Sequence, residues 1–533
     1  MNRRQPFRAP RVNRVPAHLI SAILLCVFSP LYASESQRAS RPNIVIIYTD
    51  DQGYGDAGCY NPNAKFSTPN IDSLAAGGIV FTDGHSADAV CTPSRYALLT
   101  GRYCWRTSLK RGVLGAEHPC LIPDHCPTLA TMLRDAGYET AMVGKWHLGM
   151  DFPGENAATR DWSQPTRDMP LDKGFNRYFG VPASLNYGVL AWFNGRYPIT
   201  APARFTAKKP NLRHVDYRIK PPYELTPKQV KAKLKPPVLE VAPDFTDNQC
   251  LERFTDEAIR FVNSHTTQNP QQPFFLYLPL TSPHYPVCPL PQFHGQGECG
   301  GYGEFMIETD HRIGQLLNAL KSAGVMDDTL ILFSSDNGPE RSWEQRATEF
   351  GHSSNGRLRD GKRSIYEGGH RVPFIAHWPG GIKLPGRKSS RLVCQTDYMA
   401  TIAELLGIQL PESGGGDSVS FAGELLGSPK PRQAPLMHHA ANGRLAIRLG
   451  RWKLVLPHKK ASAELYDLEA DLGESHDLGS EFPDDVARLT ALATKVVVNG
   501  RTTEGPAASN DTGYWSDLSW MKPDAFQAMD ASQ

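Results

Sequence analysis

A chain of 533 residues is longer than one hydrophobic core usually organises, so we expect two or three domains. The composition, with 40% hydrophobic and 21% charged residues, is typical of a globular protein and excludes long disordered regions. A formal net charge of only +2 excludes the strongly basic surface that nucleic-acid binding requires.

Residues 1–33 have the pattern of a removable signal peptide. Five arginines and no acidic residue precede the short apolar run Leu19 to Phe28, and Ala33 offers a cleavage site. Ten apolar residues cannot cross a bilayer, which needs roughly 20. We therefore predict an exported protein, periplasmic or secreted, with no membrane span. Without those five arginines the formal charge of +2 becomes about −3, and we predict no nucleic-acid partner.

Three apolar, β-branched runs predict strands that are buried on both faces of a sheet: residues 43–48, 274–280 and 329–334. Each run is followed at once by polar residues. In open α/β sheets, ligands bind beyond the carboxyl ends of the strands. One shared site is therefore predicted at three strand ends, formed by Asp50 and Asp51, by Thr281 to His284, and by Ser335 to Gly338.

Helical spacing of apolar residues predicts helices between these strands, at residues 69–76, 128–137, 255–264 and 304–323. The alternation of strand and helix predicts an α/β fold with a large, mixed, mostly parallel sheet sandwiched by helices.

Two regions depart from this alternation. Residues 186–247 are rich in Pro, Lys and aromatic residues without clear periodicity, and we interpret them as an insertion near the site. After residue 415, short alternating runs predict a smaller α+β subdomain with an antiparallel sheet and a helix at about residues 484–498. We therefore predict a catalytic domain at residues 41–415 and a C-terminal subdomain at residues 416–533.

Two pairs of oxygen-bearing residues follow predicted strands directly, Asp50-Asp51 and Asp336-Asn337. Adjacent acidic residues on a loop are usually only solvated. Here both pairs end a buried strand, and carboxylate and amide oxygens suit Ca²⁺ or Mg²⁺. We predict a metal site at this edge of the sheet, with Ca²⁺ as the ion.

The residues 91–102, Cys-Thr-Pro-Ser-Arg-Tyr-Ala-Leu-Leu-Thr-Gly-Arg, resemble the signature of the type I sulfatases, within the alkaline phosphatase superfamily. In that family a maturation enzyme oxidises the cysteine to Cα-formylglycine, whose hydrate attacks the sulfur of a sulfate ester. The resemblance implies an alkaline phosphatase-like fold, a formylglycine at Cys91, a bound calcium ion, and a formylglycine-generating enzyme as a partner.

Three further segments resemble the same family: residues 137–149, 281–284 and 360–369. The resemblance implies a set of catalytic residues, namely Cys91, Arg95, Lys145, His147, His284 and Lys362. It implies a set of metal ligands, namely Asp50, Asp51, Cys91 as formylglycine, Asp336 and Asn337. The expected substrate contacts are Lys145, His284, Lys362, Ser184 and His370.

In that pattern the basic side chains offset charge on the sulfate oxygens. His147 supports the formylglycine, whereas His284 and Lys362 lie on the leaving-group side. Ser184 falls where the family often has a polar loop on the sulfate side, although this chain lacks the commoner Ser-x-Asp form. His370 is expected either to reach substrate or to cap a turn.

The resemblance favours hydrolysis of sulfate esters in sulfated polysaccharide or glycosaminoglycan fragments. Two alternatives remain open: a phosphoester or phosphonate hydrolase on the same scaffold, and a carbohydrate-binding relative without activity. The pairs Cys120/Cys126 and Cys288/Cys299 are close enough in sequence to form disulfides. His438-His439 is expected at a solvated surface, and the alternative is a rim of the substrate site contributed by the C-terminal subdomain.

Overall fold

The structure is a computed structural model, and it describes residues 6, 9, 41–157, 159–207, 238–411 and 413–526. The predicted signal peptide lies outside the described residues except at positions 6 and 9, and so does the middle of the predicted insertion. In the described part of the chain, none of the helices has the length and apolar character needed to cross a bilayer.

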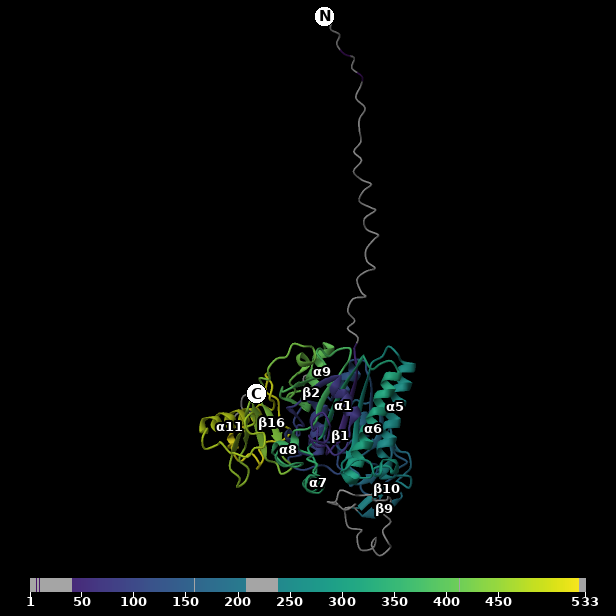
Figure 1. Cartoon of the computed structure of the whole chain (residues 1–533), viewed down its shortest axis with the longest axis horizontal. Helices are drawn as coiled ribbons and strands as arrows, with labels where there is room; N and C mark the ends of the chain where they lie inside the picture. The colour runs from purple at the N-terminus through teal and green to yellow at the C-terminus, as the bar shows by residue number, and fades with distance from the viewer. Residues whose placement is uncertain are drawn as a thin grey trace. The chain divides into compact units, whose positions relative to one another are not determined.

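A sheet of ten strands forms the centre of the unit made by residues 42–533 (Figure 1). In order across the sheet the strands are β14 (Arg387–Ser389), β2 (Gly78–Phe81), β13 (Phe374–His377), β12 (Thr329–Ser335), β1 (Asn43–Asp50), β11 (Phe274–Pro283), β4 (Glu139–Lys145), β5 (Arg177–Val181), β7 (Phe193–Asn194) and β8 (Tyr197–Pro198). From β12 through β1, β11 and β4 to β5 the pairing is parallel, whereas β13, β7 and β8 pair antiparallel. The predicted mixed, mostly parallel sheet is confirmed.

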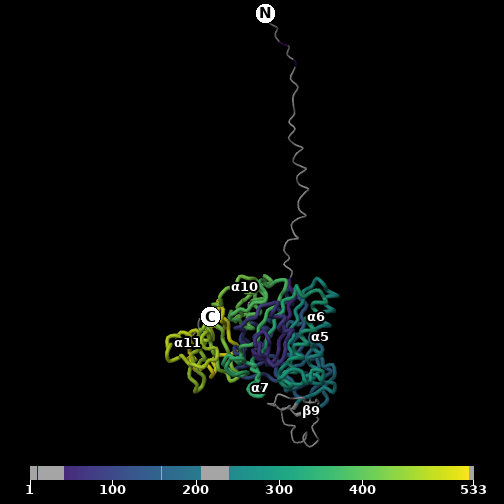
Figure 2. Tube along the Cα trace, viewed as in Figure 1, coloured from purple at the N-terminus to yellow at the C-terminus, as the bar shows by residue number. Residues whose placement is uncertain are grey.

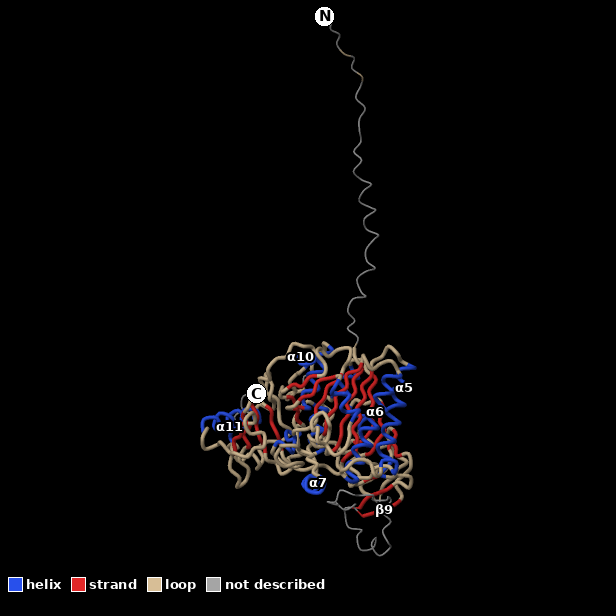
Figure 3. The backbone as a smooth tube through the Cα atoms, viewed as in Figure 1, coloured by secondary structure: helices blue, strands red, loops and turns tan. Residues whose placement is uncertain are grey.

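Helices α5 and α6 lie against the main sheet, whereas α11 lies apart from it (Figure 3). The helices of the described residues are α1 (Pro69–Ala76), α2 (Cys91–Thr100), α3 (Leu129–Asp135), α5 (Cys250–Gln268), α6 (Gly300–Ser322), α7 (Trp343–Phe350), α8 (Glu367–His370), α9 (Tyr398–Leu406), α10 (Ala422–Leu425) and α11 (Pro483–Val498). Short 3₁₀ turns are η1 (Cys104–Arg106), η2 (Pro170–Lys173), η3 (Asp247–Gln249), η4 (Pro291–Phe293) and η5 (Gln395–Asp397). Helices α5 and α6 pack on each other and on β11, while α2 packs on α3 and α9.

The strand β1 is buried along its whole length, as its uninterrupted apolar sequence predicts. Figure 2 shows the purple part of the chain, which includes β1, at the centre of the folded unit and the yellow C-terminal residues at one edge. The C-terminal sheet is antiparallel, in the order β16 (Leu436–His439), β17 (Leu445–Leu449), β18 (Trp452–Val455) and β19 (Glu464–Asp467). Helix α11 packs on β17 and β18, so the predicted antiparallel sheet with one helix is confirmed.

The region predicted as an insertion contributes in part to the main sheet, because β7 and β8 extend its edge. Its other strands form a small sheet of β6 (Val189–Leu190), β10 (Val238–Val241) and β9 (Arg204–Ala207). A two-stranded sheet joins β15 (Val393–Cys394) to β3 (Gly84–His85).

No disulfide joins the cysteines that the structure describes, so the two pairings considered from sequence are absent. The Cys126 sulfur instead lies 4.0 Å from the Tyr96 hydroxyl.

Candidate active site

The ends of β1 and β12 bring four oxygen-bearing side chains together, and we call Asp50, Asp51, Asp336 and Asn337 the oxygen site. The two strands are parallel neighbours in register, with Thr49 opposite Ser335, so the residues that follow must meet. The Asp51 amide donates to Asp336 Oδ1 at 3.1 Å, and Asn337 Nδ2 donates to Asp51 Oδ1 at 2.7 Å. All four side chains are buried.

Helix α2 begins at Cys91 and directs two side chains at the oxygen site. Residues four apart share one helix face, so Cys91 and Arg95 point the same way. The Cys91 sulfur lies 3.6 Å from Asp50 Oδ1. The Arg95 guanidinium donates two hydrogen bonds to Asp336 Oδ2, at 2.7 and 3.2 Å, and lies 3.5 Å from Asp50. Position 91 therefore stands at a helix N-terminus beside the oxygen site.

Lys145 and His147 reach the site from the end of β4. The Lys145 ammonium donates a hydrogen bond to Asp50. His147 adopts a left-handed backbone conformation, with φ of 60°. Its Nε2 lies 3.0 Å from the Leu114 carbonyl oxygen, and its buried Nδ1 has no hydrogen-bond partner. Burial, reinforced by Lys145, holds the pKa of His147 well below its usual value, so this imidazole is neutral.

His284 and Lys362 contact the other carboxylate, Asp51. The His284 Nε2 lies 3.8 Å from Asp51 Oδ2, and its Nδ1–H donates to the Tyr285 carbonyl oxygen at 2.6 Å. The Lys362 ammonium lies 2.5 Å from Asp51 Oδ1. Burial lowers the pKa of His284 to about 3. Burial alone would also lower the pKa of Lys362, but the charge of Asp51 raises it well above its usual value.

The oxygen site has the donors that a hard divalent cation needs. Asp51 Oδ2 and Asn337 Oδ1 are buried and accept no hydrogen bond. Ligand atoms of Asp50, Asp51, Cys91 and His284 all lie within 4.8 Å of one another. Burial and the nearby Asp50 raise the pKa of Asp336 to about 6, because several carboxylates are crowded together. A calcium ion would satisfy the unpartnered oxygens and offset this crowding, so the residues fit that ion.

A cavity of about 140 Å³ opens beside position 91. Among the described residues that line it are five predicted ones, namely Cys91, His147, Ser184, His284 and Lys362. Of the other predicted residues, four form the oxygen site itself, and Arg95 and Lys145 contact it. The structure thus brings together every predicted site residue except His370.

Asn186, Tyr187, Tyr285 and Arg363 also line the cavity, although the sequence did not identify them as site residues. Asn186 is the most informative, because it is buried and neither atom of its amide has a partner. The Ser184 hydroxyl is unpartnered too. Asn186 could have been found from its place in the same loop as Ser184, and Arg363 from its place next to Lys362.

His370 is placed elsewhere, in a group with His85 and His438 that we call the imidazole cluster. All three rings are fully buried. His370 Nδ1 lies 3.1 Å from His85 Nδ1, and His370 is not among the residues that line the cavity. His438 and His439, expected at a solvated surface, are both buried. Their strand β16 is an edge strand of the C-terminal sheet and contacts a distant segment of the chain, where the Ala89 amide donates to the His439 carbonyl oxygen.

Comparison with known proteins agrees with this geometry. A family model described as Sulfatase matches residues 42–408, and one described as N-sulphoglucosamine sulphohydrolase, C-terminal, matches residues 358–491. The chain is 33% identical over 505 residues to an N-acetylgalactosamine-6-O-sulfatase of Bacteroides thetaiotaomicron, covering 86% of this chain and 94% of that protein.

Arylsulfatase A of Homo sapiens is 34% identical over 504 residues, covering 88% of this chain and 90% of that enzyme. A solved sulfatase structure, from work on glycosaminoglycan metabolism by Bacteroides thetaiotaomicron, superposes with a TM-score of 0.74 at 31% identity. It covers 86% of this chain and 99% of that one.

Proposed function

This chain belongs to the sulfatase family and is a sulfuric ester hydrolase, and we propose that it removes sulfate from sulfated carbohydrates with a formylglycine at position 91 and a calcium ion. The observation that carries the proposal is the position of Cys91, at the start of α2 and 3.6 Å from a carboxylate of the oxygen site. Relatives with 30% identity or more include an N-acetylgalactosamine-6-O-sulfatase, which supports a sulfated sugar as substrate.

The oxygen site would hold the calcium through Asp50, Asp51, Asp336 and Asn337, together with position 91. When present, the formylglycine supplies the attacking oxygen and the calcium ion polarises the sulfate oxygens. Arg95 holds Asp336 through two hydrogen bonds and Lys145 holds Asp50. These two cations fix the carboxylates and offset their charge, so the site is organised before substrate arrives.

Within the cavity, Lys362 is protonated in the resting site and presents its positive charge to the sulfate oxygens. His147 is neutral and its free Nδ1 faces no partner in the protein, so it can accept a proton at position 91. The Tyr285 carbonyl oxygen fixes the His284 proton on Nδ1, which leaves Nε2 as an acceptor. On the leaving-group side, Lys362 is therefore the residue that carries a proton for the departing alcohol oxygen.

Ser184 and Asn186 complete the cavity wall. Buried polar atoms without partners cost free energy in the unliganded protein. A substrate that hydrogen-bonds to the Ser184 hydroxyl and to both atoms of the Asn186 amide would recover that cost. An amide offers a donor and an acceptor together, which suits a sugar hydroxyl or an amide substituent next to the sulfate.

Export to the periplasm, followed by removal of residues 1–33, is part of the same proposal. A formylglycine-generating enzyme would be the partner that oxidises Cys91. The signal is tested by sequencing the N-terminus of the protein recovered from the periplasm and the medium, where a start at Ser34 is expected.

Two measurements test the catalytic proposal. Peptide mass spectrometry around Cys91 should show a mass lower by about 18 Da, since the thiol side chain becomes an aldehyde. Purified protein should then release sulfate from a panel of regioselectively sulfated oligosaccharides, and should hydrolyse an aryl sulfate faster than the matching aryl phosphate. An intact thiol in a host able to mature sulfatases, or preference for the phosphate, would contradict the proposal.

A further inference from the structure

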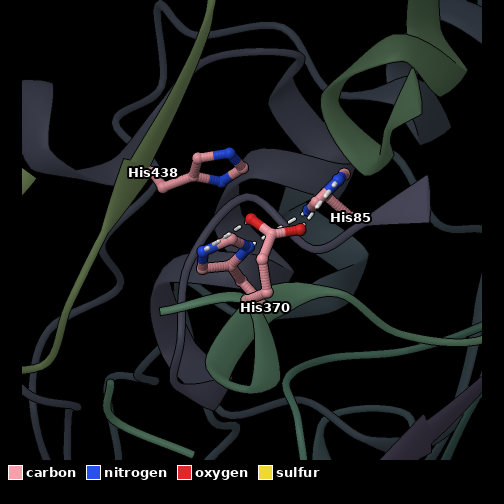
Figure 4. A group of neighbouring side chains, drawn as sticks. His85, His370 and His438 are labelled. Carbon is pink, nitrogen blue, oxygen red and sulfur yellow. Dashed lines mark hydrogen bonds and ion pairs between the residues drawn. The ribbon is translucent and has the colours of Figure 1, made fainter. Parts of the chain in front are cut away.

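The imidazole cluster gathers metal-ligating groups outside the active site. His85 lies on β3, His370 on α8 and His438 on β16, so the catalytic domain and the C-terminal sheet both contribute. Together with Glu367, their ligand atoms all lie within 4.8 Å of one another. Figure 4 shows the three rings close to one another. We propose that this cluster binds a late first-row divalent metal ion, with Zn²⁺ as the ion of best fit.

The outer nitrogens of two rings have acceptors. His85 Nε2 lies 2.8 Å from Asp83 Oδ1, and His370 Nε2 lies 3.0 Å from the Ile365 carbonyl oxygen. A metal-bound histidine typically donates its second N–H to a carboxylate or a backbone carbonyl in this way. The two Nδ1 atoms then face each other as lone pairs, 3.1 Å apart. Ligand nitrogens about 2 Å from one ion stand at about this separation.

His438 provides the second line of argument. Its side chain is fully buried, and neither ring nitrogen has a hydrogen-bond partner. The ring is stacked on His370, with centroids 3.8 Å apart, so it must turn to present a nitrogen to the same ion. No hydrogen bond opposes that rotation. The ligand atoms lie within 4.8 Å of one another, and tetrahedral coordination would bring the more distant ones closer.

A hydrogen-bonded chain without metal explains part of the same geometry. In it, His370 Nδ1–H donates to His85, and Lys453 donates to His370 Nε2 at 3.2 Å. This arrangement leaves both nitrogens of His438 unpartnered and sets a lone pair of His370 against the Ile365 carbonyl oxygen. Metal binding removes both conflicts, and Lys453 then keeps its pairs with Glu367 and Glu474 in place of the contact with His370 Nε2.

The charges around the cluster determine which ion fits. Glu367 already accepts from Lys453 at 3.0 Å and from Arg371 at 3.0 Å, and Lys453 also pairs with Glu474 at 2.8 Å. The carboxylate is therefore shared, and the imidazoles are the main ligands. Neutral nitrogen donors favour Zn²⁺ over Ca²⁺.

The cluster lines no part of the catalytic cavity, so we assign its metal a structural role. An ion held by β3, α8 and β16 would join the catalytic domain to the C-terminal sheet. Bound metal stabilises the native state by mass action, and the thermal midpoint should rise with its concentration.

The test uses the full-length protein, stripped with a chelator, reloaded with excess Ca²⁺ and titrated with Co²⁺ as a coloured probe. We expect one equivalent of Co²⁺ with the visible absorption of a nitrogen-coordinated ion, and displacement by Zn²⁺. The variant His438→Phe should weaken Co²⁺ binding at least about tenfold. The matched control His265→Phe also removes a buried ring with an unpartnered nitrogen, but lies on α5, and should bind Co²⁺ like the wild type.

Folding is checked on the metal-free proteins. Because the His438 nitrogens have no partners, His438→Phe should melt no lower than the metal-free wild type and should lose the rise in Tm that Zn²⁺ gives. If this variant unfolds, anomalous scattering from wild-type crystals soaked in Zn²⁺ decides the question at the cluster itself. Absence of nitrogen-coordinated Co²⁺ in the wild type, or equal affinity in His438→Phe, would overturn the proposal and leave the hydrogen-bonded chain.

Discussion

The oxygen site and the imidazole cluster are both buried, and both contain polar atoms without partners, yet they differ in access. The oxygen site borders a cavity of about 140 Å³ through Cys91, His284 and Lys362. The imidazole cluster borders none of that cavity, and its three rings are fully buried. We therefore propose that unpartnered buried atoms mark a turnover site in one region and a closed structural site in the other, and that access distinguishes the two.

The largest effect is expected from Cys91→Ala, which removes the only group we assign as nucleophile. The kcat for an aryl sulfate should fall on the order of 10⁵-fold or more, as in other enzymes that lose their nucleophile. Cys104→Ala, at another buried cysteine, is the control and should keep most of the activity. Activity of Cys91→Ala within tenfold of the wild type would mean that the cavity does not act through position 91.

Removal of divalent cations sharpens the comparison between the two regions. Chelation should lower kcat on the order of 10²-fold, the size expected when charge stabilisation of the transition state is lost. Ca²⁺ should restore the rate, whereas Zn²⁺ should not, because the oxygen site offers hard oxygen donors.

A matched pair of variants places the calcium effect at the oxygen site. Asn337→Ala removes one unpartnered oxygen and should weaken Ca²⁺ binding about tenfold or more. Asn263→Ala, on the exposed face of α5, should leave it unchanged. Recovery of activity with Zn²⁺ alone would contradict the assignment of donors.

The sequence predicts that the four residues of the oxygen site meet, because each pair of ligands is marked by a local sequence pattern. Each pair of ligands follows an apolar strand directly, and parallel neighbours bring such ends together. Helix bounds are predicted less well: α5 begins at Cys250 and α6 at Gly300, several residues before the expected starts. In both helices the first residues lie outside the segment with regular apolar spacing, and tertiary packing stabilises them in the helix. The spacing is the only helical signal that the sequence contains.

The imidazole cluster could not be predicted in this way. His85 lies on a strand of two residues and His370 on a helix of four, and neither element is long enough to show periodicity. His438 and His439 are adjacent polar residues, a pattern typical of a surface. Their burial follows from contacts of the edge strand β16 with residues far away in the sequence, such as Ala89, which no local pattern reveals.

A moderate effect is expected from Asn186→Ala in the cavity wall. Loss of one or two substrate hydrogen bonds should lower kcat/KM about tenfold. Stability should not fall, because the amide has no partner in the unliganded protein. Asn194→Ala, exposed on β7, is the control and should change neither quantity. A lower Tm together with unchanged kcat/KM would instead show that Asn186 is structural, and would make this wall resemble the imidazole cluster.

The smallest effect is expected at the outer edge of the cavity, where Glu340 accepts two hydrogen bonds from Arg363, at 2.6 and 2.7 Å. Glu340→Gln should release Arg363 toward an anionic substrate and lower KM about threefold, a modest change because this pair is partly exposed and solvent screens it. The gain should shrink as salt is raised. Glu344→Gln, exposed on α7, is the matched control. A rise in KM would mean that Glu340 holds Arg363 in its binding position, and the edge of the cavity would then be preorganised in the same manner as Arg95 and Asp336 in its interior.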